Sequence, residues 1–258
     1  MKKDPMSNFK DLHYQKEPLL ICNVWDVPSA KAAEELGYKA LGTSSAAMAE
    51  MLGYNDGEQM PFTDLLFMVR KLLTNTTLPL SVDIESGYSR DSKEIASNIY
   101  QLAELGVVGI NIEDTFIHDK RQFLDCQHFA LMLSEVKTYL LQKNVDVFLN
   151  VRTDSFLLGV SHPLEEALNR IKLYENAGAA GIFIPCIEEP GDIRAAVSST
   201  SLPINVMCMP NLPDFNQLKL LGVARISMGN FVHRASIRKL NYYLQGLQEQ
   251  QSFKSLFV

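Results

Sequence analysis

The sequence predicts an α/β fold, and within that class a (β/α)8 barrel, the TIM barrel. Three observations predict it: eight short apolar runs alternate with amphipathic segments, several of these segments end at a glycine, and polar residues gather directly after the apolar runs. Eight strand–helix units without an intervening linker favour a closed parallel barrel. Catalytic groups of this fold lie at the carboxyl ends of the strands, so the third observation also indicates an active face.

The individual elements follow from the pattern of apolar residues. We expect strands at residues 18–24, 39–43, 78–84, 108–112, 145–151, 180–184, 203–207 and 223–227. Amphipathic helices are expected at Ser29–Leu36, Asp64–Leu73, Ser92–Leu105, Phe129–Gln142 and Pro163–Ala177. Gly37, Gly106 and Gly178 follow three of them and can adopt the left-handed conformation of a helix C-cap. A doubly wound sheet is the alternative, but no Gly-x-Gly-x-x-Gly turn follows the first strand.

The chain shows no linker-like, repetitive or low-complexity segment. We therefore expect a single barrel domain over residues 1–258, with an N-terminal extension at 1–17 and a C-terminal helix and tail at 231–258. The tail ends in Ser252-Phe253-Lys254-Ser255-Leu256-Phe257-Val258, which is apolar enough to suggest a docking surface in a dimer or tetramer.

Composition excludes several classes of protein. Of 258 residues, 47% are hydrophobic and 21% charged, and the formal net charge is −6, which is ordinary for a soluble globular protein and argues against a nucleic-acid partner. No apolar run reaches the roughly 20 residues that span a bilayer, and the first residues lack a signal-peptide pattern. The four cysteines are far apart, with no Cys-x-x-Cys, so we expect a cytoplasmic protein without a disulfide framework.

Acidic residues end two neighbouring strands of the expected barrel. Asp83 and Glu85 are two residues apart, so their side chains point the same way, and Glu113 ends the next strand. Like charges held this close favour a cation between them. Oxygen ligands without sulfur or imidazole suit Mg²⁺, with Mn²⁺ possible. The alternative is that these acids cap helices or pair with Lys and Arg at the barrel rim.

Three further features at the same face could bind an anion or close the site. Arg152 could hold a carboxylate or phosphate in a bidentate fork, or could form a structural pair with Asp154 or Asp114. Thr43, Ser44 and Ser45 offer hydroxyl and backbone N–H groups for a carboxylate, or form a plain helix N-cap. Asp56 lies in a turn-rich loop long enough to cover the barrel mouth, or marks only an Asn-Asp-Gly turn.

Together these residues resemble the isocitrate lyase/phosphoenolpyruvate mutase superfamily. The resemblance covers nearly the whole chain, from Asn23-Val24-Trp25-Asp26 to Val223-Ala224-Arg225-Ile226-Ser227-Met228-Gly229. Its most specific parts are Thr43-Ser44-Ser45 with Leu52-Gly53-Tyr54-Asn55-Asp56-Gly57-Glu58, then Val82-Asp83-Ile84-Glu85-Ser86-Gly87-Tyr88, Ile112-Glu113-Asp114 and Val151-Arg152-Thr153-Asp154.

The resemblance implies a (β/α)8 barrel whose eighth helix swaps between subunits, and ligands that are α-keto acids or their enolates. It implies that Asp83, Glu85 and Glu113 hold Mg²⁺, partly through water. It further implies that Trp25, Thr43, Ser44 and Ser45 bind substrate, that Arg152 stabilises the reacting oxyanion, and that Asp56 lies on a mobile loop that closes over the substrate.

The chain departs from the family pattern at three places, the first of which is Glu85, where the family usually has Asp. Active carbon–carbon lyases carry a Lys-Lys/Arg-Cys-Gly-His loop after the Glu-Asp pair, whereas this chain has Thr115-Phe116-Ile117-His118-Asp119-Lys120-Arg121-Gln122. Lys120 is the candidate for an active-site lysine found there in some relatives. Cys186 stands where tricarboxylate-cleaving relatives tend to have Glu, and Pro185-Cys186 replaces a His-Ser pair of phosphonomutases. Cleavage of isocitrate or methylisocitrate is therefore not expected.

The resulting hypothesis is an Mg²⁺-dependent lyase that cleaves a carbon–carbon bond in a small α-keto or 2-hydroxy acid through an enolpyruvate-like intermediate. Carbon–phosphorus chemistry, of the phosphonomutase or phosphonopyruvate hydrolase type, is the alternative among enzymes. The missing Cys-Gly-His loop also leaves open a barrel that binds a keto acid without turning it over.

Overall fold

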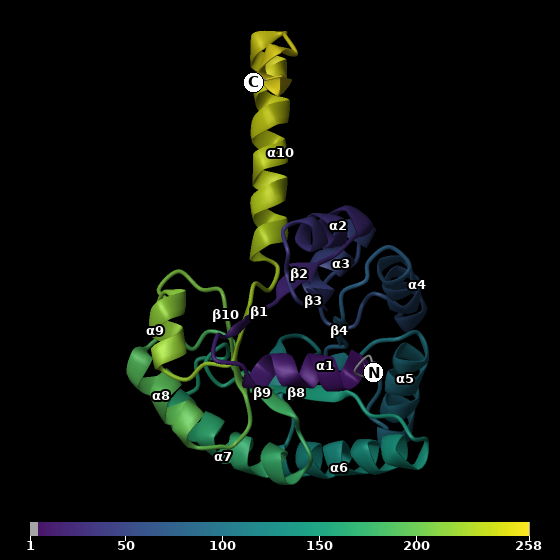
Figure 1. Cartoon of the computed structure of the whole chain (residues 1–258), viewed down its shortest axis with the longest axis vertical. Coiled ribbons are helices and arrows are strands. Elements are labelled where there is room, and N and C mark those ends of the chain that lie inside the picture. Colours follow the sequence, from purple (N-terminus) through teal and green to yellow (C-terminus); the bar gives the residue numbers. More distant parts are fainter. Residues whose placement is uncertain (1–4, 258) are drawn as a thin grey trace.

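The computed structural model describes residues 5–257, and its main sheet closes into a barrel (Figure 1). Within these residues the sheet has nine strands, in the spatial order β1-β11-β10-β9-β8-β5-β4-β3-β2, and every pair in it is parallel. The strands are β1 (Leu19–Leu20), β2 (Cys22–Val24), β3 (Leu41–Thr43), β4 (Leu80–Asp83), β5 (Gly109–Glu113), β8 (Phe148–Arg152), β9 (Gly181–Phe183), β10 (Ile204–Met207) and β11 (Arg225–Ser227).

Closure of the barrel depends on the first strand, which is split in two. β1 pairs with β11 and β2 pairs with β3, with only Ile21 between them. The Ile21 N–H donates to the carbonyl oxygen of Ile226 (2.9 Å), so the first strand joins the two ends of the sheet. The predicted (β/α)8 fold is therefore confirmed, and each expected strand is present with ends shifted by a few residues.

Helices cover the outer face of the barrel. They are α2 (Val27–Glu35), α3 (Ser45–Leu52), α4 (Phe62–Leu73), α5 (Ser92–Glu104), α6 (Cys126–Gln142), α7 (Pro163–Asn176), α8 (Pro190–Ser198) and α9 (Phe215–Leu220). Gly37, Gly106 and Gly178 follow α2, α5 and α7 with positive φ, as their C-terminal positions predicted. The main core lies between these helices and the outward side chains of the strands.

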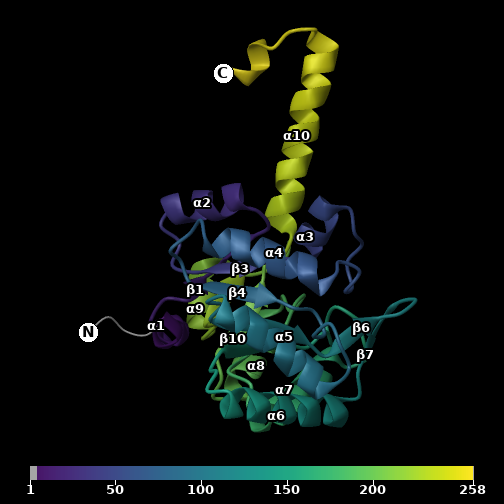
Figure 2. The same cartoon turned by 90° about the vertical axis from the view of Figure 1, so that its right-hand side faces the viewer.

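The N-terminal segment of the chain covers the end of the barrel at which the strands begin. α1 (Pro5–Asp11) and the 3-10 turn η1 (Leu12–Tyr14) lie across this end, opposite the small hairpin of β6 (Thr115–Ile117) and β7 (Arg121–Phe123) (Figure 2). Phe9 inserts among Ile21, Phe148 and neighbouring apolar residues as a second, smaller core. Gly109 makes this possible, because a Cβ at that position would lie 2.7 Å from the Phe9 ring. Residues 1–4 of the expected N-terminal extension lie outside the described part of the chain.

The carboxyl end of the chain forms a long helix that leaves the barrel. α10 (Phe231–Gln250) projects away from the body and is followed by the 3-10 turn η2 (Lys254–Leu256) (Figures 1 and 2). His233, near its start, is the buried residue of α10. No helix in the described range 5–257 is long and apolar enough to cross a membrane.

The stability of the closed end is expected to depend on His13. Its ring stacks on Phe148 (4.1 Å between centroids) and its Nδ1 lies 3.0 Å from the Phe9 carbonyl oxygen. Burial, aided by the positive charge of Arg225, lowers the pKa of His13 from 6.5 to about 3. The folded protein therefore binds this proton less well than the unfolded chain, so stability is complete above pH 6.5 and falls as the pH drops towards 3.

We predict that His13→Gln removes this dependence on pH. Between pH 7 and pH 5, wild type should lose about 2 kcal/mol more free energy of unfolding than the variant, measured by urea denaturation. The exposed His162, changed to Gln, is the control and should behave as wild type. Parallel pH curves for wild type and His13→Gln would contradict the assignment.

Candidate active site

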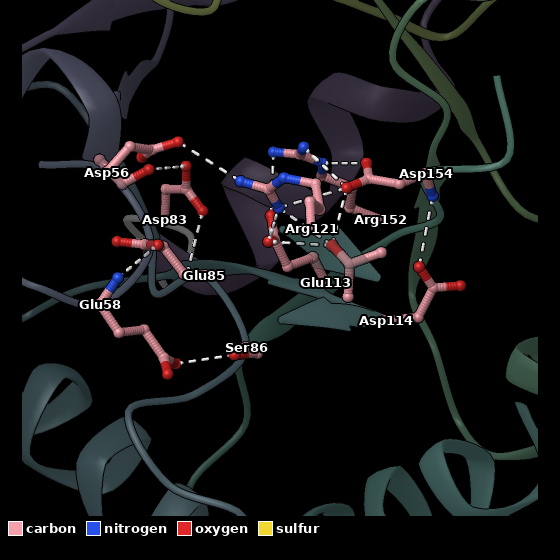
Figure 3. A network of polar contacts seen from close by, with 12 residues as sticks. Asp56, Glu58, Asp83, Glu85, Ser86, Glu113, Asp114, Arg121, Arg152 and Asp154 are labelled. Atoms are coloured by element: carbon pink, nitrogen blue, oxygen red, sulfur yellow. Dashed lines mark hydrogen bonds and ion pairs between the residues drawn. The ribbon is translucent and has the colours of Figure 1, made fainter. Parts of the chain in front are cut away.

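A pocket of about 290 Å³ opens at the carboxyl ends of the barrel strands. Eight of the ten site residues expected from the sequence line it, and they come from β3, β4, β5, β8 and the loops after them. These eight are Thr43, Ser44, Ser45, Asp56, Asp83, Glu85, Glu113 and Arg152. The face predicted from the distribution of polar residues is therefore the face that carries the pocket (Figure 3).

Asp83 and Glu85 are fixed by hydrogen bonds to different segments. The Ser45 hydroxyl donates to Asp83 Oδ2 (2.9 Å), and the Asp83 N–H donates to Thr43 Oγ1 (2.8 Å). Glu85 has a φ of +52°, in the left-handed region, and its Oε2 accepts from the Glu58 N–H (2.7 Å). Such backbone strain is often found at functional sites, because the surrounding structure must hold it in place.

The acids carry negative charge that the protein compensates only in part. Burial raises the pKa of Asp83 and of Glu113, while the nearby Arg152 acts in the opposite direction on both. Burial and the charges of Asp56, Asp83 and Glu113 raise the pKa of Glu85 to about 9. Full ionisation of Asp83, Glu85 and Glu113 is therefore unfavourable without a nearby cation, and a bound cation would favour their charged forms.

The arrangement of these acidic side chains decides which kind of metal ion the pocket could bind. Among residues 5–257, no group of three or more His, Cys, Asp or Glu side chains stands in an arrangement that holds an ion directly. Mg²⁺ commonly keeps several waters and binds through one or two carboxylates. The oxygen donors present thus fit Mg²⁺, which Asp83, Glu85 and Glu113 would hold, partly through water.

Thr43, Ser44 and Ser45 lie where β3 passes into α3. Ser44 is the N-cap of α3, since its hydroxyl accepts from the Ala47 N–H (3.3 Å). The alternative of a helix N-cap is therefore observed, and it is compatible with a binding role. The free N–H groups and the dipole of a helix N-terminus attract a carboxylate, and these three residues face the pocket.

Arg152 is paired and also lines the pocket. It stands opposite Glu113 in the register of β5 and β8, and its Nη1 lies 2.9 Å from Glu113 Oε2. Its Nε and Nη2 donate to the two oxygens of Asp154 at 2.6 and 3.0 Å. The structural pair with Asp154 is thus present, whereas Asp114 pairs with Arg170 instead. Two carboxylates fix the Arg152 guanidinium and hold its charge at the pocket.

Arg121 is a site residue that the sequence reading missed. It begins β7 (Arg121–Phe123), which pairs with β6 (Thr115–Ile117) in an antiparallel hairpin after β5. Its Nη1 pairs with Glu113 and lies 3.3 Å from Asp154 Oδ2, while its Nη2 lies 3.3 Å from Asp56 Oδ2 (Figure 3). The hairpin therefore brings a second guanidinium into the pocket.

Lys120, the neighbour for which a catalytic role was expected, is exposed at the turn of this hairpin and does not line the pocket. Successive side chains of a strand point to opposite faces, so only one of two neighbours can face the pocket. This alternation could have pointed to Arg121 instead of Lys120, but only if the segment had been known to form a hairpin. Trp25 also lies outside the pocket lining, where its ring packs edge-on against His233 (4.9 Å).

The loop that carries Asp56 meets the hairpin over the pocket. Gly57, with a φ of +98°, packs so closely on Ile117 that a Cβ there would lie 2.7 Å from its Cδ1. Glu58 attaches the other side of the loop, because its Oε1 accepts from the Ser86 hydroxyl (2.9 Å) and the Tyr88 N–H (2.7 Å). The loop and the hairpin thus meet beside the pocket, which Asp56 and Arg121 both line.

Comparison with known proteins agrees with this geometry. The phosphoenolpyruvate phosphomutase family model matches residues 9–247. An uncharacterised protein of Mycobacterium tuberculosis is 32% identical over 89% of this chain and 84% of its own, and an oxaloacetate decarboxylase of Bradyrhizobium sp. is 28% identical over 91% and 82%. A solved structure from Burkholderia cenocepacia J2315, described as a candidate phosphonomutase, is 32% identical with a TM-score of 0.88, over 94% of this chain and 100% of its own.

The contact between Arg121 and Asp56 leads to a prediction about the loop. We predict that Arg121→Gln loosens residues 54–60, so that their amide hydrogen exchange, followed by mass spectrometry, becomes at least severalfold faster. Lys120→Gln changes the adjacent, exposed residue and should leave this exchange unchanged. Equal exchange in both variants would show that Arg121 does not hold the loop.

Proposed function

Because the chain belongs to the phosphoenolpyruvate phosphomutase family, within the isocitrate lyase/phosphoenolpyruvate mutase superfamily, we propose that it is an Mg²⁺-dependent lyase. Its reaction is cleavage of a carbon–carbon bond in a small α-keto or 2-hydroxy acid. The observation that carries this proposal is the fixed Arg152 guanidinium, paired with Glu113 and Asp154, beside both Asp83 and the Thr43–Ser45 segment. A clamp for an oxyanion thus lies next to hard oxygen donors and a carboxylate site.

Each group has a role in the proposed reaction. The N–H and hydroxyl groups of Thr43–Ser45 bind the substrate carboxylate at the start of α3. Arg152 donates to the oxygen that becomes negative when the bond next to the carbonyl breaks. Asp83, Glu85 and Glu113 would hold Mg²⁺, partly through water, and the ion would add positive charge to stabilise the same oxygen.

In an α-keto acid, the bond from the carbon next to the keto group to a departing carboxylate breaks; the carboxylate leaves as CO2, the electron pair forms an enolate, and the enolate takes a proton on carbon to become the α-keto acid product. In a 2-hydroxy acid, the hydroxyl loses a proton and becomes the carbonyl of one product, and the electron pair of the broken bond forms the enolate of the other, which is then protonated on carbon. Asp56 is our candidate for carrying a proton, since it lies on the covering loop and lines the pocket. Arg121 holds Asp56 on one side and Glu113 on the other. Closure of loop and hairpin would keep bulk water from the enolate.

Carbon–phosphorus chemistry is the second candidate, favoured by the family description and by the Burkholderia relative. A phosphonate carries up to two negative charges and needs cationic or N–H donors around it. Pro185, Phe183 and Met207 form the wall at the end of β9 and β10, and they supply no side-chain donor there. This wall is the reason for ranking carbon–carbon cleavage first.

We predict turnover of at least one member of a panel of small α-keto and 2-hydroxy acids in the presence of Mg²⁺, followed by NMR detection of the products. Asp83→Asn should lower kcat/KM by about 10²-fold or more, the size expected for loss of a group that stabilises developing charge. Asp146→Asn, at an exposed surface pair with Lys137, is the control. Consumption of phosphonopyruvate with a changed phosphorus signal would favour the second candidate, and binding without any turnover would favour a silent barrel.

We further propose that the protein is a homo-oligomer in which α10 packs against a partner barrel. The helix projects from the body, and large apolar side chains along it are exposed, among them Leu240 (49%) and Leu244 (54%) (Figure 2). Apolar residues exposed along one helix indicate an interaction surface rather than a solvated one.

Light scattering should accordingly give a dimer or tetramer at micromolar concentration. Leu240→Glu combined with Leu244→Glu should shift the mass towards the monomer, because two charges would be buried in the interface. Leu131→Glu on α6, at a similarly exposed position (58%), is the control and should leave the measured mass unchanged. A wild-type monomer at every concentration would rule the proposal out.

A further inference from the structure

The pocket has two chemically different halves. The polar half comes from β3, β4, β5 and the hairpin, and it includes Thr43–Ser45 and the acids. The other half carries Leu157, Phe183, Pro185 and Met207, which come from the β8–α7 loop and the ends of β9 and β10, beside the uncharged polar residues Ser227 and Asn230. We call the first four of these residues the apolar wall. A substrate anchored at Thr43–Ser45 must present one of its groups to this wall.

The apolar wall is built into the barrel and is not a chance exposure of hydrophobic residues. Phe183 stands opposite Arg152 in the register of β8 and β9, is buried, and has its ring centroid 5.8 Å from the Arg152 guanidinium carbon. Met207 fills the space left by Gly229, because a Cβ at that glycine would lie 2.7 Å from the Met207 sulfur. Both side chains are therefore held in place by neighbours before any ligand binds.

The cation nearest this wall is Arg152, which packs on Phe183 but already pairs with two carboxylates. Among the described residues that line the pocket, the cations are Arg121 and Arg152. Arg121 pairs with Asp56, Glu113 and Asp154, and Arg152 pairs with Glu113 and Asp154, so both are held on the polar side. A carboxylate pressed against the apolar wall would lose hydration without gaining an unpaired cation, which is unfavourable.

We propose that the apolar wall selects an uncharged alkyl substituent, so that the substrates are alkyl-bearing α-keto or 2-hydroxy acids rather than acids with a further carboxylate at this position. The inference rests on the proposed function and defines its substrate class. The pocket volume agrees with this substrate class. About 290 Å³ is roughly the volume of ten water molecules in the liquid, which is enough for a small acid with hydrated Mg²⁺.

Calorimetry with a series of α-keto acids in the presence of Mg²⁺ tests the inference without depending on turnover. Affinity should rise about fourfold for each methylene from pyruvate to 2-oxobutanoate to 2-oxopentanoate. 2-Oxoglutarate has the same carbon chain length as 2-oxopentanoate but ends in a carboxylate, and it should bind at least tenfold more weakly. Equal or tighter binding of 2-oxoglutarate would overturn the inference while leaving the proposed function intact.

Variants of the wall give the reverse test. Leu157→Lys, at a partly exposed loop position that tolerates change, and Met207→Lys should each raise affinity for 2-oxoglutarate relative to 2-oxopentanoate by tenfold or more. Met209→Lys, two residues from Met207 and outside the pocket lining, is the matched control. If either pocket variant fails to fold, the calorimetric titrations of the wild-type protein with the keto-acid series test the inference without the variants. Absence of binding by every keto acid would overturn the inference together with the proposed function.

Discussion

The ion pair between Glu113 and Arg152 is the interaction on which the rest of the site depends. The two residues stand side by side at the ends of β5 and β8, where the Glu113 side chain is buried and the Arg152 side chain is 16% exposed. Either charge alone would be costly at this depth, since removing one partner leaves the other uncompensated. Asp154 accepts from the same guanidinium, and Arg121 adds a second positive charge from the hairpin. The pocket is therefore organised around two arginines shared by buried carboxylates.

The network of arginines and carboxylates connects the pocket to the neighbouring hairpin and to α7. Asp114, next to Glu113, turns away from the pocket and binds Arg170 and Tyr174 of α7. Arg170 in turn stacks on Phe123 of the hairpin, with its guanidinium carbon 3.7 Å from the ring centroid. The hairpin that delivers Arg121 is thus fixed from behind by α7 and in front by Glu113. Covering loop, hairpin and strand ends form one continuous polar network (Figure 3).

The barrel and its active face could be predicted because they follow from local patterns: apolar strand runs, glycine C-caps and acids after strands. For the same reason, the sequence could predict four residues of this face: Asp83, Glu85, Glu113 and Arg152. Arg121 could not be predicted in this way, because the two strands of its hairpin hold only three residues each and are stabilised by contacts of Ile117 and Phe123 with distant segments. The apolar wall was missed since Leu157, Phe183 and Met207 are far apart in sequence and look like ordinary core residues.

The central claim is that this polar network assembles a site for a metal-supported enolate. Calorimetric titration with oxalate, a planar analogue of the pyruvate enolate, tests it most directly. We expect tight binding of oxalate that requires Mg²⁺ and is abolished by Arg152→Met, which removes the guanidinium but keeps the apolar stem. Oxalate binding that is independent of Mg²⁺, or no binding under either condition, would contradict it. The family resemblance would then describe the fold alone.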